Sequence, residues 1–199
     1  MPSPDWNARF SDSEYAYGTE PNEFLVQQAF RVSGPVLSIA EGEGRNAAYL
    51  ASNGHHVHAV DGSAVGLAKA VKLADQYGVQ ISTEVSDLSD YEPAENAFRS
   101  IISIYAHLDG SIRRRLYPLL AKALKPGAIL ILEAYSENQI GRGTGGPGDV
   151  DLLMSCSKIE NEFVGLETVC LHEIEREVHE GKFHTGMASV IQYVGRKAE

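Results

Sequence analysis

Two glycines separated by one residue follow a short apolar run and precede a segment with helical spacing. The run is residues 36–39, the glycines are Gly42 and Gly44, and the helical segment begins near Asn46. Because glycine has no Cβ, backbone N–H groups of such a turn can come within hydrogen-bonding distance of a ligand. The positive end of the following helix favours an anionic group there. This arrangement predicts the first βα unit of a nucleotide-binding fold.

Polar residues also follow three later segments that read as strands. Asp61 ends the segment 56–61, Asp87 follows 80–85, and His107 follows 100–105. An ionised Asp at the end of the second strand can accept both hydroxyl protons of a ribose, but the same residue can simply cap a helix or turn. Asp87 either accepts a hydrogen bond from an adenine amino group or caps a turn. His107 either moves a proton or packs beside a ligand.

Strands that alternate with helices predict an α/β fold with a largely parallel sheet. Right-handed crossovers place the carboxyl ends of its parallel strands at one edge, so the polar residues should meet there. Pro118 lies inside a predicted helix, where proline can kink the chain. The predicted helices are 21–31, 46–51, 64–77, 111–122 and 150–163, a fifth strand covers 128–134, and 168–178 and 185–194 form an antiparallel hairpin.

Two segments outside this core leave alternatives open. The glycine-rich stretch 135–149 follows the fifth strand and is either a lid over a ligand or an irregular connection. Its cation, Arg142, either meets an anionic acceptor or is solvated. Near the N-terminus, Trp6, Phe10 and Tyr17 either attach the first helix to the domain or form a flap over a ligand.

Composition limits the class of protein. A length of 199 residues suits one domain, and a net charge of −10 argues against general affinity for nucleic acid. The sequence has no apolar run of about 18 residues and no signal peptide, so we expect no membrane partner and a cytoplasmic location. Cys156 and Cys170 lack metal-like spacing and fit a reduced protein. We expect no metal site, because neither acids nor cysteines complete a ligand set around the histidines of 55–58.

Several segments together resemble the motifs of class I S-adenosylmethionine-dependent methyltransferases. They are Leu37–Ala47 for motif I, Val60–Asp61 for motif II, Ser86–Leu88 for motif III and Leu124–Gly127 for the post-III motif. The Gly-x-Gly-Arg-Asn form of motif I, with Trp6–Phe10 and Tyr17–Asn22 ahead of it, resembles the tellurite-resistance (TehB-like) and thiopurine methyltransferase branch.

The resemblance implies a doubly wound, three-layer Rossmann-like methyltransferase fold. Its seven-stranded mixed sheet would have the order 3-2-1-4-5-7-6, with strand 7 antiparallel. Residues 1–199 would form a single methyltransferase domain. Within it, 1–34 would be an N-terminal flap and helix, 35–134 the cofactor-binding core, 135–165 a loop and helix over the substrate side, and 166–197 the hairpin.

The resemblance also assigns residues to S-adenosylmethionine, whose product is S-adenosylhomocysteine. Gly42 and Gly44 would approach its methionine part and Asp61 its ribose, with Tyr105 and His107 near the sulfonium. The expected cofactor-binding residues are Trp6, Phe10, Tyr17, Glu41, Gly42, Glu43, Gly44, Arg45, Asn46, Asp61, Gly62, Ser63, Ser86, Asp87, Leu88, Ile104 and Tyr105, and the expected catalytic residues are His107 and Arg142.

The sequence departs from the family at motif I. Ser38 stands where an acid is common, and Ala40 where a glycine is common. Glu41 is therefore expected to supply a carboxylate for the ammonium group of the cofactor, with help from a water. No Asn/Asp-Pro-Pro-Tyr sequence follows the fourth strand, which argues against methylation of an exocyclic DNA amine.

The expected function is in-line transfer of a methyl group to a small-molecule acceptor, such as a thiol or a chalcogen oxyanion. One alternative is an NAD(P)-linked or flavin oxidoreductase, because Gly42–Ala47 also satisfies the looser dinucleotide pattern. Glu41 and Glu43 flank this turn, however, and would be unfavourable beside a pyrophosphate. The other alternative is a cofactor-binding domain without catalytic activity.

Overall fold

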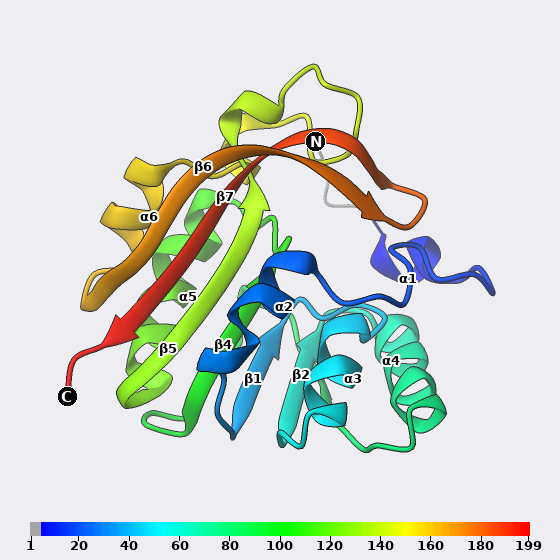
Figure 1. Ribbon diagram of the computed structural model, residues 1–199, viewed down its shortest axis with the longest axis horizontal. Coiled ribbons are helices and arrows are strands. Elements are labelled where there is room, and N and C mark those ends of the chain that lie inside the picture. Colours follow the sequence, from blue (N-terminus) through cyan, green and yellow to red (C-terminus); the bar gives the residue numbers. More distant parts are fainter. Residues whose placement is uncertain (1–4) are drawn as a thin grey trace.

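A seven-stranded sheet runs through the computed structural model, which describes residues 5–199 (Figure 1). The strand order is β3-β2-β1-β4-β5-β7-β6, and β7 is antiparallel to both of its neighbours. The predicted order and its antiparallel strand are therefore confirmed. The strands are β1 (Val36–Ile39), β2 (Val57–Asp61), β3 (Ser82–Val85), β4 (Phe98–Ile104), β5 (Leu124–Tyr135), β6 (Leu166–Glu180) and β7 (His184–Lys197).

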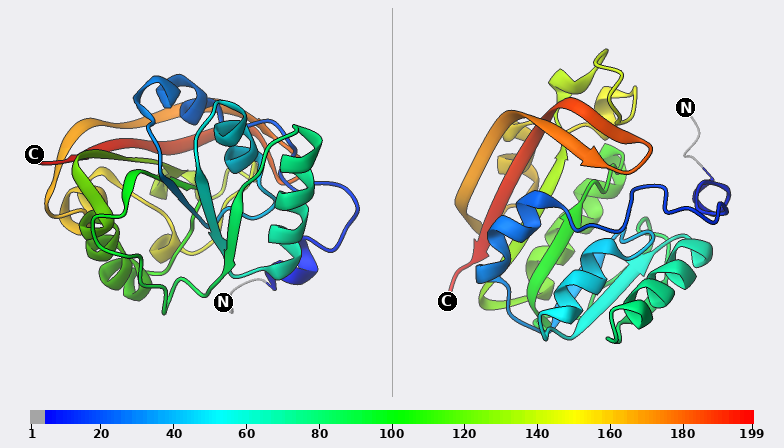
Figure 2. Two further views of the ribbon diagram at one scale, coloured as in Figure 1. Left: turned by 90° about the horizontal axis from the view of Figure 1, so that it is seen from below. Right: turned by 45° about the vertical axis from the view of Figure 1, so that its right-hand side comes forward.

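Helices cover both faces of the sheet and form a three-layer arrangement (Figures 1 and 2). One face carries α2 (Glu23–Gln28), α3 (Arg45–Ser52) and α4 (Ala64–Gln76), and the other carries α5 (Gly110–Ala123) and α6 (Cys156–Glu162). Short elements are α1 (Trp6–Arg9) and the 3-10 helices η1 (Ala29–Arg31), η2 (Glu137–Gln139) and η3 (Val150–Leu152). No helix within residues 5–199 is both long and apolar enough to cross a membrane.

The inner strand β5 shows how the sheet divides its side chains between the two cores. Leu130 and Leu132 pack on the side of α5 and α6, whereas Ile129 and Ile131 pack on the side of α2 and α3. Successive side chains of a strand point to opposite faces, so Glu133 and Tyr135 continue the row of Ile131. A buried acid and a buried tyrosine thus face the α2–α3 layer near the carboxyl end of β5.

The prediction of one helix over 150–163 is wrong. The chain is helical at η3 and α6 but extended between them, where Met154 forms a bridge with Ser136. Leu153 and Met154 are buried, and the Ser155 hydroxyl accepts a hydrogen bond from the first turn of α6. Burial of these two apolar residues against β5 therefore replaces the central helical turn. Pro118, in contrast, lies inside α5 without ending it.

The β6–β7 hairpin arches beyond the sheet, and its turn reaches the N-terminal segment (Figure 1). The Lys182 N–H donates to the Ala16 carbonyl oxygen at 3.0 Å. Gly181 lies directly against the backbone of Tyr17 and Gly18, where a Cβ would come within 2.5 Å of Gly18 N. Residues 10–22, here called the strap, therefore lie between the hairpin and the glycine turn after β1.

Gly44 allows helices α3 and α4 to pack closely. It caps α3 with a φ of +88°, and an ideal Cβ there would lie 2.5 Å from both Cα and Cβ of Ala70. Gly54 has almost the same φ, +87°, but a Cβ there would meet no atom within 4 Å. The two positions thus share a backbone conformation that would strain any other residue, and they differ in the space available for a side chain.

We expect Gly44→Ala to lower the free energy of unfolding more than Gly54→Ala, as measured by urea denaturation. Both substitutions place a side chain in the left-handed region, at a cost of about 1–2 kcal/mol. Only Gly44→Ala adds overpacking, at about 1–3 kcal/mol more. Equal losses in the two variants would contradict the tight contact between α3 and α4.

Candidate functional site

The ends of β1, β2 and β3 meet at one edge of the sheet and hold the Asp61 carboxylate. Asp61 Oδ2 accepts from Gly42 N–H and Oδ1 from Ser63 N–H, each at 2.8 Å, and the Ser86 N–H donates to the Asp61 carbonyl oxygen at 3.0 Å. Burial raises the pKa of Asp61 although these two hydrogen bonds oppose the shift. Each oxygen keeps a further lone pair, so the carboxylate can still accept protons from ligand hydroxyls.

The other expected adenosine-side residues surround Asp61. Ser63 caps α4 through its hydroxyl, which accepts from the Gly66 N–H at 3.0 Å. Asp87 accepts from the Ser89 N–H at 2.8 Å and so closes a turn, while Leu88 is buried in the core beneath it. The structure therefore brings the expected ribose and adenine residues to one edge and gives most of them a local structural role as well.

The two acids of the glycine turn are held by protein groups. Glu41 is buried, with its oxygens bound by the Ser38 hydroxyl and by the Ala47 N–H, the latter at 2.9 Å. Burial raises the pKa of Glu41. Glu43 pairs with Lys69. Glu41 thus links β1 to α3. Its expected contact with the ammonium group of the cofactor stays a prediction.

Arg45 and Asn46 begin α3, but their side chains bind other parts of the chain. Arg45 pairs with Glu180 of the hairpin at 2.5 Å, and Asn46 Oδ1 accepts from the Asn22 N–H at 2.9 Å. Their expected role in binding cofactor stays a prediction. Their side chains hold the hairpin and the strap in place.

A row of rings runs from the glycine turn to the end of β4. Phe10 is buried, and its ring lies 3.2 Å from where a Cβ of Gly42 would be. Centroid distances are 5.7 Å for Trp6–Phe10, 6.3 Å for Phe10–Tyr17, 4.5 Å for Tyr17–His184 and 4.6 Å for His184–Tyr105. The N-terminal aromatics therefore lie over the turn, and the row connects Gly42 to Tyr105.

The row ends in a compact cluster of four rings, Tyr105, His107, Tyr135 and His184. His107 and Tyr135 are nearly parallel, 12° apart with centroids at 5.5 Å, and Tyr135 lies 4.7 Å from Tyr105. Tyr105 has a φ of +53°, a strained conformation for a non-glycine residue. Such strain is found preferentially at functional sites, and here it occurs immediately after β4.

His107 is held as a neutral ring. Its Nδ1 lies 3.1 Å from the Leu152 carbonyl oxygen. A carbonyl can only accept, so Nδ1 carries the proton, and Nε2 presents a lone pair. Burial and the nearby His184 ring lower the pKa of His107 to about 3. The buried Nε2 has no hydrogen-bond partner among residues 5–199.

A buried network of charges lies beside this cluster. The fully buried Glu133 accepts from Asn22 Nδ2 at 2.8 Å, Tyr105 Oη at 3.0 Å, Arg176 at 2.8 Å and Gln192 Nε2 at 2.6 Å. Arg176 also bonds Glu180 at 3.1 Å. Burial raises the pKa of Glu180, but the His184 ring and the Arg45 and Arg176 charges more than offset this, so the pKa lies below its ordinary value.

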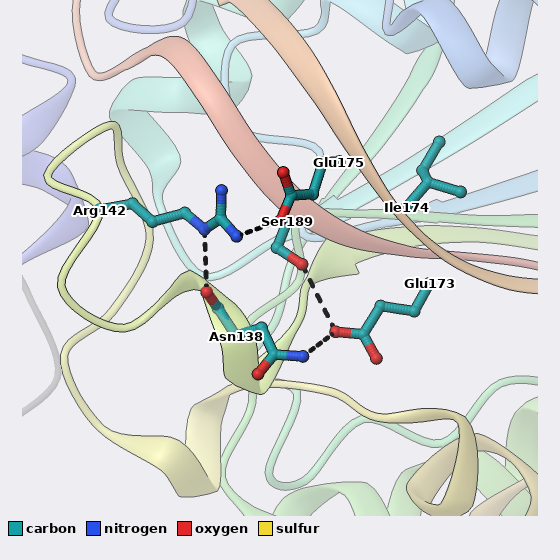
Figure 3. A pocket seen from close by; sticks show the side chains of 6 residues that line it. All are labelled: Asn138, Arg142, Glu173, Ile174, Glu175 and Ser189. Atoms are coloured by element: carbon teal, nitrogen blue, oxygen red, sulfur yellow. Dashed lines mark hydrogen bonds and ion pairs between the residues drawn. The ribbon is translucent and has the colours of Figure 1, made fainter.

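Arg142 does not join these rings, which corrects its expected place in the site. It pairs with Glu175 at 2.6 Å in a separate pocket of about 440 Å³ (Figure 3). Glu175 and Ser189 pair in register and point away from Val190, which packs on Tyr135. The pocket is lined by Asn138, Arg142, Glu173, Ile174, Glu175 and Ser189.

Sequence reasoning did not single out Glu133, Tyr135 or Glu180. Glu133 interrupts the apolar run of β5, and a buried acid requires partners, so its position carried a signal. Tyr135 ends β5 at the same edge as Asp61 and His107, and the rule for strand ends applies to it as well. His184 and Arg176 belong to the hairpin strands β7 and β6, and only the pairing of this hairpin with β5 brings them to the site.

Comparisons with known proteins agree on the fold. Residues 36–127 match a family model described as a methyltransferase domain, and no curated protein matches the sequence. A structure reported for the conversion of a disulfide bond into a thioacetal group during echinomycin biosynthesis is 20% identical, with a TM-score of 0.77, over 96% of this chain and 88% of that chain.

Two further solved structures are similar. TehB from Haemophilus influenzae is 16% identical with a TM-score of 0.73, over 88% of this chain but only 62% of the TehB chain. The N-methyltransferase NodS from Bradyrhizobium japonicum WM9, in complex with S-adenosylhomocysteine, is 13% identical with a TM-score of 0.71, over 98% of this chain and 97% of that chain. At these identities the likeness shows a Rossmann-like methyltransferase fold.

The buried neutral His107 should make stability depend on pH. Its folded pKa lies below the ordinary value of 6.5. As the pH falls below this value, the unfolded chain therefore takes up a proton that the folded chain refuses. The free energy of unfolding should then fall by up to about 1.4 kcal/mol per pH unit.

We expect urea denaturation between about pH 7 and about pH 4 to show a steeper loss for the wild type than for His107→Asn. Asn keeps a donor for the Leu152 carbonyl but does not titrate. His172→Asn, at an exposed position of β6, is the matched control and should follow the wild type. Parallel pH curves for wild type and His107→Asn would contradict a buried, neutral His107.

Proposed function

We propose that this protein is an S-adenosylmethionine-dependent methyltransferase that acts on a small-molecule acceptor. The observation that carries the proposal is the Asp61 carboxylate, fixed by Gly42 N–H beside the Gly-x-Gly turn in a segment that matches a methyltransferase domain. An acid at the end of β2 next to this turn suits a ribose diol. The formal charge of −10 favours a small acceptor over nucleic acid. Free Cys156 and Cys170 fit the reducing cytoplasm.

The residues of the sheet edge fit the cofactor in the proposed arrangement. Asp61 would bind the ribose, Ser86–Leu88 would border the adenine, and Gly42 would approach the methionine part. Ile104 ends β4 and Tyr105 follows it at the same edge of the sheet. When bound, the cofactor supplies a methyl group on a sulfonium, and transfer forms a bond from the acceptor atom to the methyl carbon while the carbon–sulfur electron pair stays on sulfur. The protein then contributes alignment and exclusion of water.

The acceptor would meet the ring cluster around His107. Thiols and chalcogen oxyanions are the acceptor classes that the family resemblance suggests, and the likeness to TehB points in the same direction. His107 and Tyr135 are the residues that we propose to touch the acceptor. Arg142 has no part in this proposal, because its guanidinium is bound to Glu175 in the other pocket.

Calorimetric titration with S-adenosylhomocysteine, run beside NAD and NADP, tests the proposal. We expect only S-adenosylhomocysteine to bind, and Asp61→Asn to weaken it about tenfold to a hundredfold, because hydrogen bonds to a charged group contribute about 1.5–3 kcal/mol. Asp75→Asn, on the exposed side of α4, is the matched control and should bind like the wild type. Binding of a dinucleotide in place of S-adenosylhomocysteine would overturn the proposal.

Trp6 should report cofactor binding, because it is the only tryptophan and its ring stacks on Phe10. Phe10 contacts Gly42, so a ligand lying over the Gly42 backbone must shift this ring. We expect S-adenosylhomocysteine to change the Trp6 emission in a saturable titration whose Kd agrees with calorimetry. Calorimetric binding without any change in emission would show that the strap does not cover the cofactor.

A further inference from the structure

Three buried polar atoms of the ring cluster lack a hydrogen-bond partner in the described part of the chain. They are His107 Nε2, Tyr135 Oη and His184 Nδ1, the last of which lies 3.9 Å from Glu180 Oε2, too far for a hydrogen bond. Buried polar atoms are normally paired, because an unpaired one costs about 1–3 kcal/mol. Their accumulation in rings 5.1–5.5 Å apart marks a place where a polar ligand would complete the hydrogen bonding.

The glycine-rich loop closes over the same atoms. An ideal Cβ at Gly145 would lie 2.6 Å from Tyr135 Oη and 3.1 Å from His184 Cδ2. Gly145 has a φ of +124°, which favours glycine. The loop therefore forms one wall of the cluster and leaves no room for a side chain at Gly145.

The free atoms of the cluster differ in whether they can donate or accept a hydrogen bond. His107 Nδ1 is committed to the Leu152 carbonyl, so Nε2 can only accept while the ring is neutral. The Tyr135 hydroxyl can donate or accept. A ligand that carries a hydrogen and a lone pair on one atom, as a hydroxyl or a thiol does, satisfies both groups at once.

The nearby cations are engaged elsewhere. Arg45 is bound to Glu180, Arg176 to Glu133 and Glu180 through Nη2, and Arg113 to Glu162 at 2.8 Å. The buried Arg176 Nε has no hydrogen-bond partner within residues 5–199, but the charge of this guanidinium is balanced by the two carboxylates. Arg9 lies over the Phe183 ring, 4.2 Å from its centroid. The carboxylates already balance the buried guanidinium charges. An anionic ligand would lie in a desolvated site beside Glu133 and Glu180, and its binding is therefore unfavourable.

We infer that the acceptor is an uncharged molecule whose nucleophilic atom is an un-ionised hydroxyl or thiol, and that it donates its hydrogen to His107 Nε2 while Tyr135 Oη binds the same atom. This inference rests on the proposed function and selects between the acceptor classes named there. On methyl transfer the acceptor proton passes to Nε2. The methylated oxygen or sulfur is strongly acidic while it still holds that proton, so a weakly basic imidazole suffices to take it.

The first test is NMR of protein with isotopic nitrogen in its histidines, in complex with S-adenosylhomocysteine. His107→Asn assigns the resonances of His107. We expect a proton on Nδ1, a lone pair on Nε2 and no titration of this ring between about pH 8 and about pH 5. An Nε2–H tautomer, or a titration within that range, would overturn the inference.

The second test uses probes that differ in charge. Phenol, benzyl alcohol and benzyl mercaptan are the neutral probes, and benzoate, selenite and tellurite are the anionic ones. At millimolar concentration we expect at least one neutral probe to shift the Nε2 resonance and the anions to leave it unchanged. A shift caused only by an anion, or by no probe, contradicts the inference. Loss of an anion effect in Arg9→Ala would then identify Arg9 as the anion ligand.

The third test removes single hydroxyl groups. Tyr135→Phe should leave stability and S-adenosylhomocysteine affinity unchanged, because the hydroxyl has no partner within residues 5–199, but should lower kcat/KM for the best neutral probe about tenfold. Tyr117→Phe is the matched control. Its hydroxyl is also buried and unpaired in the described chain, but it stacks on Phe163 on the other face of the sheet.

The control should match the wild type in kcat/KM, and equal rates for the two variants would refute a role for Tyr135. His107→Asn should lower methyl transfer more strongly than Tyr135→Phe without weakening S-adenosylhomocysteine. Failure of the proposed function has a different signature. It would appear as no calorimetric binding of S-adenosylhomocysteine to the wild type, whereas the charge and tautomer of His107 are also measured by the same NMR experiment on the protein without S-adenosylhomocysteine.

Discussion

The arrangement of the site depends on one buried carboxylate, Glu133. An isolated charge at this depth would cost many kcal/mol, so the carboxylate is compatible with folding only when its donors are in place. The donors come from four separate segments, namely the strap, the end of β4, β6 and β7. Each hydrogen bond therefore fixes the position of one segment relative to β5. Removing one donor would leave the charge underpaired, which is why such networks favour a single arrangement.

This network explains why the two halves of the site are built differently. The half around Asp61 is local, because each strand end and the turn after it belong to one βα unit. The half around His107 is assembled from distant segments, with Tyr135 at the end of β5 and His184 at the start of β7. Glu133 lies between the halves and binds Tyr105, whose ring belongs to the row that joins them. Local folding positions one half, and tertiary hydrogen bonding positions the other.

The same division decides what could be predicted from the sequence. The apolar run before Gly42, the helix after it and Asp61 at the next strand end are patterns within one βα unit, and they predicted this part of the fold correctly. Arg45 and Asn46 belong to the same motif, but their partners Glu180 and Asn22 are far away in the chain, so the sequence did not reveal these contacts. The split of the predicted helix 150–163 has the same cause, because Met154 pairs with Ser136. Arg142 was assigned from the composition of its loop, whereas its partner Glu175 is set by the register of β6.

Both ends of the site are covered in this structure, and the covers differ in their chemistry. Phe10 lies on Gly42 as an aromatic ring, held in a strap that is itself bound to Glu43 and to the hairpin. Gly145 lies on Tyr135 as bare backbone, in a loop whose glycines adopt left-handed conformations. An aromatic cover supplies apolar surface to a ligand beneath it, while a glycine cover lets a carbonyl or N–H come close to the acceptor. Exclusion of water by both covers would matter for the proposed methyl transfer, since water is itself a hydroxyl nucleophile and would otherwise compete for a lone pair such as that of His107 Nε2.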